Sequence, residues 1–307
     1  MMSNFVCTNP GMRLDKFLSK EMSVSRAHAQ KLIADAVVFV NGSGMKASYS
    51  LKERDKVVVN EVKVEEVVFE GEDIDLDIIY KCDDFLVINK AAGMVVHPGE
   101  AGGHMTGTVA NAVVKYVDKG VGEDLRPGIV HRLDKETSGL MLIARTVEAY
   151  EYFVGLFKKR EIKKTYLALV KGKLEHEEGV IDSPIGRDVK SRKKMGLTGD
   201  GKAAVTRYLV DKVYAVDAKK NFSLLSIGLE TGRTHQIRVH MAAIDHAVVG
   251  DGVYGVREVN KWFREELGLE RQFLHAHLLE FKDLQGVSHK IKAPLAEELQ
   301  SVLDSLS

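Results

Sequence analysis

The chain has 307 residues with 45% hydrophobic and 29% charged residues, and its formal net charge is +0. This composition is typical of a globular protein of one or two domains and excludes a disordered chain. No apolar run approaches the roughly 18 residues that a membrane span needs, and two cysteines cannot form a disulfide framework or a four-cysteine zinc site. We therefore expect a cytoplasmic protein without membrane association.

The zero net charge hides an acidic segment. Residues 63–84 carry nine Asp/Glu against two Lys/Arg, whereas residues 1–62 carry nine Lys/Arg against six Asp/Glu. We interpret the acidic segment as a linker that contains a strand, between two mildly basic parts. Basic clusters at residues 158–164 and 190–194 favour a polyanionic partner, although each cluster alone also fits a solvated surface.

The first part predicts a small helix–helix–strand module. Leu14, Phe17 and Leu18 recur at helical spacing, and residues 29–36 repeat the pattern with Ser25 as a candidate N-cap. Residues 37–40 are β-rich, Asn41-Gly42 is a strong turn signal, and a further strand is expected over residues 56–59. Basic residues outnumber acidic ones on the two predicted helices, which favours one phosphate-facing side: Arg13, Lys16, Lys20, Arg26 and Lys31.

Strand patterns dominate the second part. The predicted strands are residues 85–89, 139–145, 164–171, 203–210, 222–229 and 273–281. Two helices are expected: one has Val147, Tyr150, Val154 and Phe157 on one face, and the other closes the chain after Pro294. The pattern predicts an α+β protein, in which a large mixed, mainly antiparallel sheet with flanking helices follows the small module.

A carboxylate between cations is the most informative feature of this part. In residues 131–139, Asp134 lies between Arg132 and Lys135, and a buried-looking strand follows. A nearby cation lowers the pKa of an aspartate below its usual value of about 3.9 and keeps the carboxylate ionised. The residues alone leave two interpretations open, a functional carboxylate and a salt-bridged strand end.

Several kinds of chemistry lack their motifs. The sequence has no GxGxxG or GxxxxGK[ST] nucleotide-binding loop and no GxSxG hydrolase elbow. It has no HExxH pair, and His235 and His240 are five residues apart, which puts them on different faces of a helix or a strand. We expect neither a metal nor a cofactor.

The first module resembles the S4-like RNA-binding domain. The resemblance lies in residues 13–18, Ser25-Arg26 and residues 38–42, with Ala36 or Val37 where that domain usually has glycine. It implies a domain at residues 12–72 that contacts the shape and backbone of folded RNA. Its expected RNA-binding residues are Arg13, Lys16, Arg26 and Lys31.

Residues 76–307 resemble the RluA-type pseudouridine synthase family and form the expected catalytic domain. Five motifs carry the resemblance, at residues 90–99, 131–139, 164–166, 231–240 and 250–255. Two departures are visible: Ala91 stands where the family commonly has proline, and Glu136 where it has aspartate. The resemblance implies an isomerase that converts uridines of RNA, most similar to the kind that modifies large-subunit ribosomal RNA, to pseudouridine without cofactor or metal.

The resemblance also implies roles for particular residues. Asp134 matches the essential carboxylate, Tyr166 the aromatic partner under the flipped uracil, and Arg233 the arginine that pairs with the carboxylate. Arg132 matches the residue that enters the space left by the extruded base. His131, Lys135 and Arg238 are expected to support the site or contact RNA. Whether the carboxylate attacks covalently or deprotonates a glycal-like intermediate stays open.

Two other functions are compatible with parts of the sequence. A ribosome-binding or assembly factor with an inactive synthase-like domain would share both modules. A nucleoside-cleaving glycosidase would need two carboxyl groups about 5–5.5 Å apart, and neither Glu136 nor Asp251 is a clear second one. We expect a monomer with RNA as its partner, while the target uridine depends on RNA shape and cannot be predicted from these residues.

Overall fold

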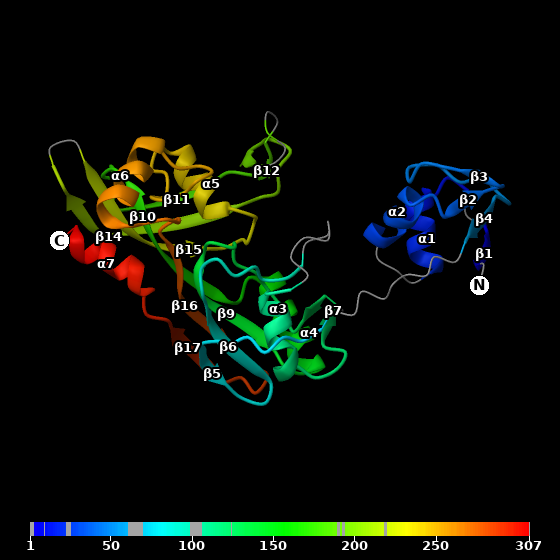
Figure 1. Ribbon diagram of the computed structural model, residues 1–307, viewed down its shortest axis with the longest axis horizontal. Helices are drawn as coiled ribbons and strands as arrows, with labels where there is room; N and C mark the ends of the chain where they lie inside the picture. The colour runs from blue at the N-terminus through cyan, green and yellow to red at the C-terminus, as the bar shows by residue number, and fades with distance from the viewer. Residues whose placement is uncertain are drawn as a thin grey trace. The chain divides into compact units, whose positions relative to one another are not determined.

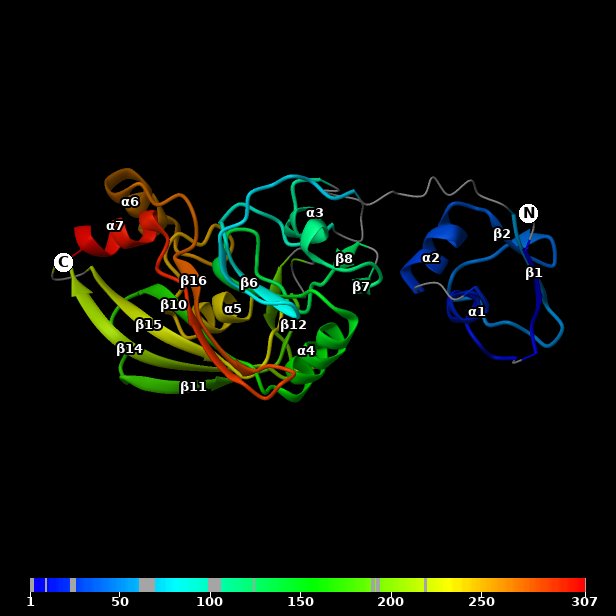
Figure 2. The ribbon, with the colours of Figure 1, turned by 90° about the horizontal axis from the view of Figure 1, so that it is seen from below.

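The computed structural model describes residues 3–8, 10–22, 26–60, 70–98, 106–123, 125–188, 191, 194–217 and 220–306. The chain forms two compact units, residues 1–68 and residues 69–307 (Figures 1 and 2). None of the helices in the described part of the chain has the length and apolar character that crossing a membrane requires.

The first unit is a four-stranded sheet with two helices. The sheet order is β1-β4-β2-β3, and the helices are α1 (Leu14–Glu21) and α2 (Arg26–Ala34). Its strands are β1 (Ser3–Val6), β2 (Val38–Val40), β3 (Ser43–Gly44) and β4 (Lys56–Val59). Asn41 and Gly42 join β2 to β3 with φ angles of +50° and +81°, which is the left-handed backbone that a tight hairpin turn of this sequence requires.

Apolar residues at helical spacing build the core of the first unit. Leu14, Phe17 and Leu18 of α1 are buried against Val38 and Val57 of the sheet, as the periodicity predicted. Strand β1, which pairs with β4, was not predicted. Ser25, the candidate N-cap, lies outside the described residues.

The second unit contains a nine-stranded sheet. The order is β11-β14-β15-β10-β16-β9-β6-β5, and β17 pairs with β16. The strands are β5 (Ile78–Lys81), β6 (Phe85–Lys90), β9 (Ser138–Ala144), β10 (Lys163–Lys171), β11 (Glu178–Asp182), β14 (Val205–Ala215), β15 (Asn221–Leu229), β16 (Leu274–Lys282) and β17 (Ser288–Lys292). The pairing of β16 with β9 is parallel, and the other described pairings in this sheet are antiparallel. The predicted α+β class with a mixed, mainly antiparallel sheet is confirmed.

Helices and small hairpins surround this sheet. The helices are α3 (Val109–Val113), the 3₁₀ turn Val114–Tyr116, α4 (Val147–Lys159), α5 (Gln236–Ala243), α6 (Arg257–Leu267) and α7 (Glu297–Ser305). Two-stranded hairpins are formed by β7 (Gly122–Glu123) with β8 (Arg126–Pro127) and by β12 (Ile185–Arg187) with β13 (Met195–Leu197).

The helix predicted from residue 147 onward exists, and its apolar face was predicted in part, since Tyr150 and Phe157 pack against the core. Ala149, Phe153 and Leu156 are its buried residues, whereas Val147 and Val154 are 42% and 39% exposed. The spacing i, i+4, i+7 of the buried set is also helical, so the apolar pattern of this helix was ambiguous. The C-terminal helix buries Leu299, Val302 and Leu303, as predicted.

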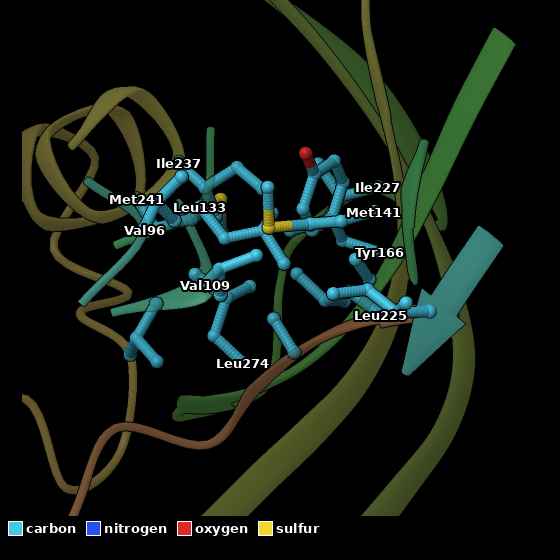
Figure 3. Close-up of a cluster of buried hydrophobic side chains, with 14 of the residues drawn as sticks. Val96, Val109, Leu133, Met141, Tyr166, Leu225, Ile227, Ile237, Met241 and Leu274 are labelled. Carbon is cyan, nitrogen blue, oxygen red and sulfur yellow. The ribbon is translucent and has the colours of Figure 1, made fainter. Parts of the chain in front are cut away.

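An apolar cluster lies beneath the residues that form the candidate site. Figure 3 shows Leu133 beside Ile237 and Met241 of α5, with Tyr166, Leu225 and Ile227 contributed by β10 and β15. All of these except Tyr166 are aliphatic or contain sulfur, and the cluster packs the sheet against α5 and the loop before β9. The polar side chains of the site are therefore supported from one side by a close-packed core.

A glycine fixes the end of the loop that precedes β9. Gly139 has a φ of +112°, and a Cβ there would come within 2.3 Å of the backbone oxygen of Ala276 in β16. Only glycine permits both this backbone angle and this close approach. The loop that carries Asp134 is thus anchored directly to the parallel pairing of β9 with β16.

Candidate active site

A pocket opens between the loop before β9 and the segment that joins β15 to α5. It is lined by Arg132, Leu133, Asp134, Thr137, Tyr166, Leu229, Gly232, Arg233, Thr234, His235, Gln236, Ile237, Arg238 and Leu274. Two motifs separated by about a hundred residues therefore line the same pocket, and β10 contributes Tyr166.

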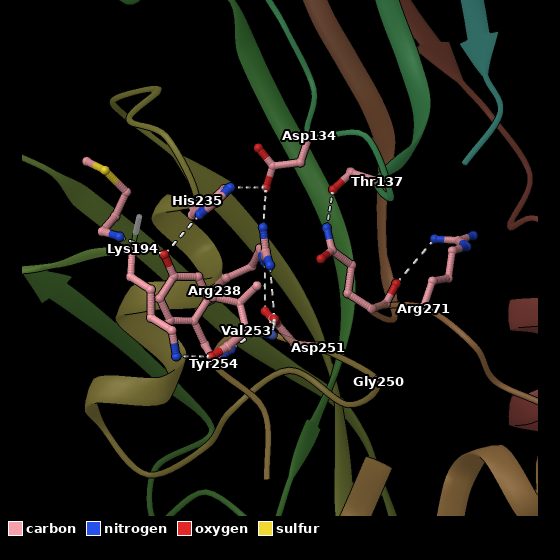
Figure 4. A network of polar contacts seen from close by, with 12 residues as sticks. Asp134, Thr137, Lys194, His235, Arg238, Gly250, Asp251, Val253, Tyr254 and Arg271 are labelled. Carbon is pink, nitrogen blue, oxygen red and sulfur yellow. Dashed lines mark hydrogen bonds and ion pairs between the residues drawn. The ribbon is translucent and has the colours of Figure 1, made fainter. Parts of the chain in front are cut away.

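Asp134 carries the carboxylate of this pocket. Its Oδ2 accepts a hydrogen bond of 3.0 Å from Nη1 of Arg238 and lies 3.9 Å from Nε2 of His235 (Figure 4). The side chain of Asp134 is 20% exposed, so the carboxylate is both held by a cation and accessible from the pocket.

Arg238 is itself anchored by a second aspartate. Its Nε and Nη2 donate hydrogen bonds of 2.7 and 3.0 Å to the two carboxylate oxygens of Asp251. Asp251 is buried and also accepts from the backbone N–H groups of Val253 and Tyr254. Burial alone would raise the pKa of Asp251, but the hydrogen bonds and charge of Arg238 outweigh it and hold that pKa below its usual value. The result is a fixed, buried ion pair that presents one guanidinium nitrogen to Asp134.

A strained turn places His235 beside Asp134. His235 has a φ of +56° and immediately precedes α5. The side-chain oxygen of Gln236 accepts from the hydroxyl of Thr231 and the backbone N–H of Arg233, at 2.7 and 3.0 Å. These bonds close the turn, and they offset the cost of a left-handed residue that is not glycine.

A buried lysine supports the loop that carries Asp134. The ammonium of Lys90 donates to the backbone oxygens of Lys135, Ala91 and Met94, at 2.7 to 3.0 Å. Lys90 is buried, and desolvation lowers its pKa to about 8.

Arginine and glutamine residues next to β16 support the same loop. Nη1 of Arg271 donates to the backbone oxygen of Glu136, and Gln272 Nε2 donates to the hydroxyl of Thr137 at 2.8 Å. A hydrogen bond of 3.0 Å from Arg271 Nε to Glu298 extends this network to α7. The loop that carries Asp134 is therefore held at Lys135, Glu136 and Thr137.

Tyr166 forms the apolar wall of the pocket. It lies on β10 and is 7% exposed, with its ring among the core side chains in Figure 3. Burial, and then the charge of Asp134, raise the pKa of Tyr166. Its phenol is consequently protonated at neutral pH.

The predicted ion pair between Arg233 and Asp134 is wrong. Nε of Arg233 instead donates to the backbone oxygen of Ala203 at 3.1 Å, and the contact with Asp134 is made by Arg238. Of the two roles expected for Arg238, support of the site or contact with RNA, its contacts fit the first, since its side chain is 7% exposed and engaged with two aspartates. Both arginines belong to one motif, and the turn at His235 decides which one points to Asp134.

The other predicted residues of the second unit differ in exposure. Arg132 is exposed at the pocket. His131 is directed inward: its Nε2 accepts a hydrogen bond of 2.9 Å from the backbone N–H of Leu142, and its ring stacks on Phe157. Desolvation, followed by the charge of Lys164, lowers the pKa of His131 to about 3, so of its two expected roles the neutral imidazole fits structural support.

The candidate RNA-binding residues of the first unit are partly described. Lys16 is exposed, and Arg13, whose side chain is 47% exposed, donates from two guanidinium nitrogens to the buried Asp15. Arg26 and Lys31 lie on α2, but their side chains are outside the described residues.

Three residues of the site were not predicted. Asp251, Tyr254 and His235 all lie in motifs that carry the family resemblance, at residues 250–255 and 231–240, but no role in the site was predicted for any of them. The sequence signal for the first two was the GDGVYG motif at residues 250–255. The first glycine of this motif, Gly250, is required sterically, because a Cβ there would come within 2.0 Å of the backbone oxygen of Arg271.

The fold and the pocket define an enzyme domain that follows a separate small unit. The sequence profile described as "RNA pseudouridylate synthase" matches residues 84–243, and the profile of the S4 domain matches residues 12–64. Since the first profile covers more than half of the chain, the chain belongs to the RNA pseudouridine synthase family, whose members are isomerases acting on RNA.

Individual relatives agree with this family. The protein "Uncharacterized RNA pseudouridine synthase YlyB" of Bacillus subtilis (strain 168) is 41% identical over 298 residues, which cover 96% of this chain and 94% of the relative. "Ribosomal large subunit pseudouridine synthase D" of Escherichia coli (strain K12) is 38% identical over 306 residues, 96% of this chain and 90% of the relative. The solved structure "Human RNA Pseudouridylate Synthase Domain Containing 1" is similar with a TM-score of 0.58 and 28% identity, over 73% of this chain and 85% of that one.

Proposed function

We propose that this RNA pseudouridine synthase acts on large-subunit ribosomal RNA and that Asp134 is its essential carboxylate. In the family reaction the glycosidic nitrogen–carbon bond of a uridine within RNA is broken, the uracil turns, and a carbon–carbon bond replaces the broken one. The substrate is supported by relatives named ribosomal large subunit pseudouridine synthase D, one of which aligns with 96% of this chain.

One observation carries the assignment of Asp134. Of the two aspartates on Arg238, the side chain of Asp134 is 20% exposed and lines the pocket, whereas that of Asp251 is 0% exposed. Only Asp134 can reach a nucleotide. The guanidinium of Arg238 stabilises its negative charge and fixes its position, as expected for a carboxylate that must act while ionised. In this proposal Arg238 takes the role that the sequence suggested for Arg233.

The neighbouring residues suit an extruded nucleotide. The ring of Tyr166 would lie under the uracil, and stacking of this kind contributes about 1–3 kcal/mol. Arg132 is an exposed planar cation at the pocket, and it would fill the space that the extruded base leaves in the RNA. Arg233 would contact the RNA near the pocket entrance.

The proposal also covers RNA binding by the first unit, the oligomeric state and the cellular location. The S4 unit would bind the RNA backbone through Arg13, Lys16, Arg26 and Lys31. The enzyme would act as a monomer. It would work in the cytoplasm, as the small number of cysteines indicates.

Replacement of Asp134 tests the function. We expect Asp134→Asn to abolish tritium release from ribosomal RNA labelled at carbon 5 of uridine, while RNA binding is retained. Asp245→Asn is the matched control, since Asp245 is exposed and asparagine tolerates its φ of +63°. Full activity of the Asp134→Asn enzyme on its target RNA would refute the assignment of Asp134. Mapping the modified uridines in cells that lack this chain identifies the target.

A further inference from the structure

Tyr254 lies at the centre of a set of contacts that ends at Asp134 (Figure 4). Its hydroxyl oxygen accepts a hydrogen bond of 2.9 Å from the backbone N–H of Met195 in β13 and lies 2.9 Å from Nδ1 of His235. The guanidinium of Arg238 lies over the tyrosine ring, 5.1 Å from its centre. Tyr254 thus touches both residues that face the Asp134 carboxylate.

These contacts decide where the proton of His235 resides. The Met195 N–H group occupies one acceptor site of the Tyr254 oxygen, which leaves the hydroxyl proton available for Nδ1 of His235. Nδ1 then accepts, and the proton of a neutral imidazole must be on Nε2. Nε2 is the nitrogen that lies 3.9 Å from Asp134.

The other two protonation states of His235 fit the contacts of Nδ1 and Nε2 less well. With the proton on Nδ1, the Nε2 lone pair would face the Asp134 carboxylate, and no described residue provides an acceptor for the Tyr254 proton. An imidazolium is disfavoured as well, since burial lowers the pKa of His235. Arg238 and Arg132 act in the same direction, and Asp134 and Asp251 oppose them.

We propose that Tyr254 is a positioning residue that holds His235 as the neutral tautomer with its proton on Nε2, so that an uncharged N–H group faces Asp134. The inference rests on the proposed role of Asp134. A charged His235 would compete with Arg238 for the same oxygen, Oδ2, and would pull the carboxylate out of its position. The Tyr254 hydroxyl prevents this because it donates to the nitrogen that would otherwise accept the second proton.

The tautomer can be measured on the unmodified full chain. Nitrogen NMR of protein labelled in its histidines distinguishes protonated from unprotonated ring nitrogens, and His235→Gln identifies the signals of His235. We expect an unprotonated Nδ1 and a protonated Nε2 at pH values from about 6 to 8. A proton on Nδ1, or a charged ring near neutral pH, would overturn the proposal. This readout needs no activity, so it is separate from the test of Asp134.

Removal of the hydroxyl tests the consequence for catalysis. In Tyr254→Phe, Nδ1 loses its donor and the charged form of His235 becomes more favourable. We expect kcat to fall about fivefold near pH 6, the equivalent of one hydrogen bond, with KM for RNA nearly unchanged. The loss should shrink towards pH 8, where the ring stays neutral. Tyr152→Phe, which removes a hydroxyl bonded to the backbone oxygen of Lys282, is the control and should change neither constant.

A double mutant separates this role from simple support of the β12–β13 hairpin. If Tyr254 acts through the imidazole, Tyr254→Phe should cost nothing further in the His235→Gln background, and the pH dependence should vanish there. An equal loss in both backgrounds would show that the hydroxyl only supports the hairpin and would overturn the proposal. Activity of Asp134→Asn would instead refute the proposed function and leave the measured tautomer unaffected.

Discussion

Arg238 lies 3.0 Å from Asp134 and holds it with a single guanidinium nitrogen, because the other two bonded nitrogens are committed to the buried Asp251. The position of the Asp134 carboxylate therefore depends on Asp251, which is buried and cannot reach the substrate. This arrangement separates two tasks: Asp251 fixes the arginine, and the arginine fixes and stabilises Asp134.

Substitution of the two arginines of the 231–240 motif should give very different results. A lysine cannot reproduce the planar fork that joins two aspartates, so Arg238→Lys should lower kcat by about a hundredfold and destabilise the fold by up to about 3 kcal/mol. Arg233→Lys should change kcat less than about threefold. Single-turnover tritium release and urea unfolding measure the two effects. Equal losses for both variants would contradict the assignment of Arg238.

Asp251 should stabilise the protein in a pH-dependent way. Its pKa in the folded protein is below the usual value, so its stabilising contribution is complete above the unfolded pKa of about 3.9 and is lost as the pH falls towards the folded pKa. The difference in free energy of unfolding between the natural chain and Asp251→Asn should therefore be constant above about pH 5 and shrink as the pH falls from about 5 towards 3. Urea unfolding across this range measures it. A constant difference would show that the carboxylate is not held in its charged form by Arg238.

The ring of Tyr166, and not its hydroxyl, should matter for activity. Tyr166→Phe should keep kcat within about threefold, whereas Tyr166→Leu, which fills the core but cannot stack, should lower kcat/KM about ten- to a hundredfold, in line with 1–3 kcal/mol of stacking. Because the pKa of Tyr166 is raised, its ionisation should not limit activity up to about pH 9. An inactive Tyr166→Phe enzyme would indicate that the phenol takes part in proton transfer.

Lys90 should produce a stability change at alkaline pH. Its pKa is lowered from 10.5 to about 8 in the folded protein, so between these values the unfolded chain binds more protons and the stability due to Lys90 rises with pH. Relative to Lys90→Met, the natural chain should gain on the order of 3 kcal/mol between about pH 8 and pH 10.5. Urea unfolding of both proteins at several alkaline pH values measures the gain. Parallel pH profiles would mean that the ammonium is not desolvated.

The sequence predicted the sheet well because apolar alternation marks half-buried strands. The strands predicted at residues 85–89 and 164–171 differ from β6 and β10 by one residue at one end. Helix α5 was missed for a physical reason. Its buried residues include Gln236, Arg238 and His240, so it has no apolar stripe that separates a core face from a solvent face.

The site was predicted in part because its residues come from motifs distant in sequence. Asp134 and Tyr166 do line one pocket. Whether Arg233 or Arg238 points to Asp134 depends on the left-handed backbone of His235. No residue next to His235 in the sequence signals this conformation. The roles of Asp251 and Tyr254 depend on tertiary packing of the 250–255 turn against α5, and no periodicity encodes it.

The S4 unit should contribute affinity for RNA but little to the chemical step. Exchange of Arg13, Lys16, Arg26 and Lys31 for glutamine in the full chain should weaken binding of intact target RNA. The slope of log K against log salt concentration, where K is the association constant for RNA, should become less steep by about 0.7–0.9 for each RNA phosphate that the variant no longer neutralises. On a short RNA that contains only the target uridine, kcat should stay within about twofold, since no described residue of the first unit lines the pocket. Filter binding at several salt concentrations and tritium release measure the two effects.

Lys46→Gln is the control for loss of a single exposed lysine elsewhere in the same unit, because it removes one charge from the linker between β3 and β4. We expect this variant to keep the salt dependence of the natural chain, since Lys46 lies away in sequence from the N-cap residue Arg13 and from the two helices that carry the other three exchanged residues. An unchanged salt dependence in the fourfold variant would show that these residues do not face the RNA backbone. A large loss of kcat on the short RNA would show that the first unit acts on the catalytic step.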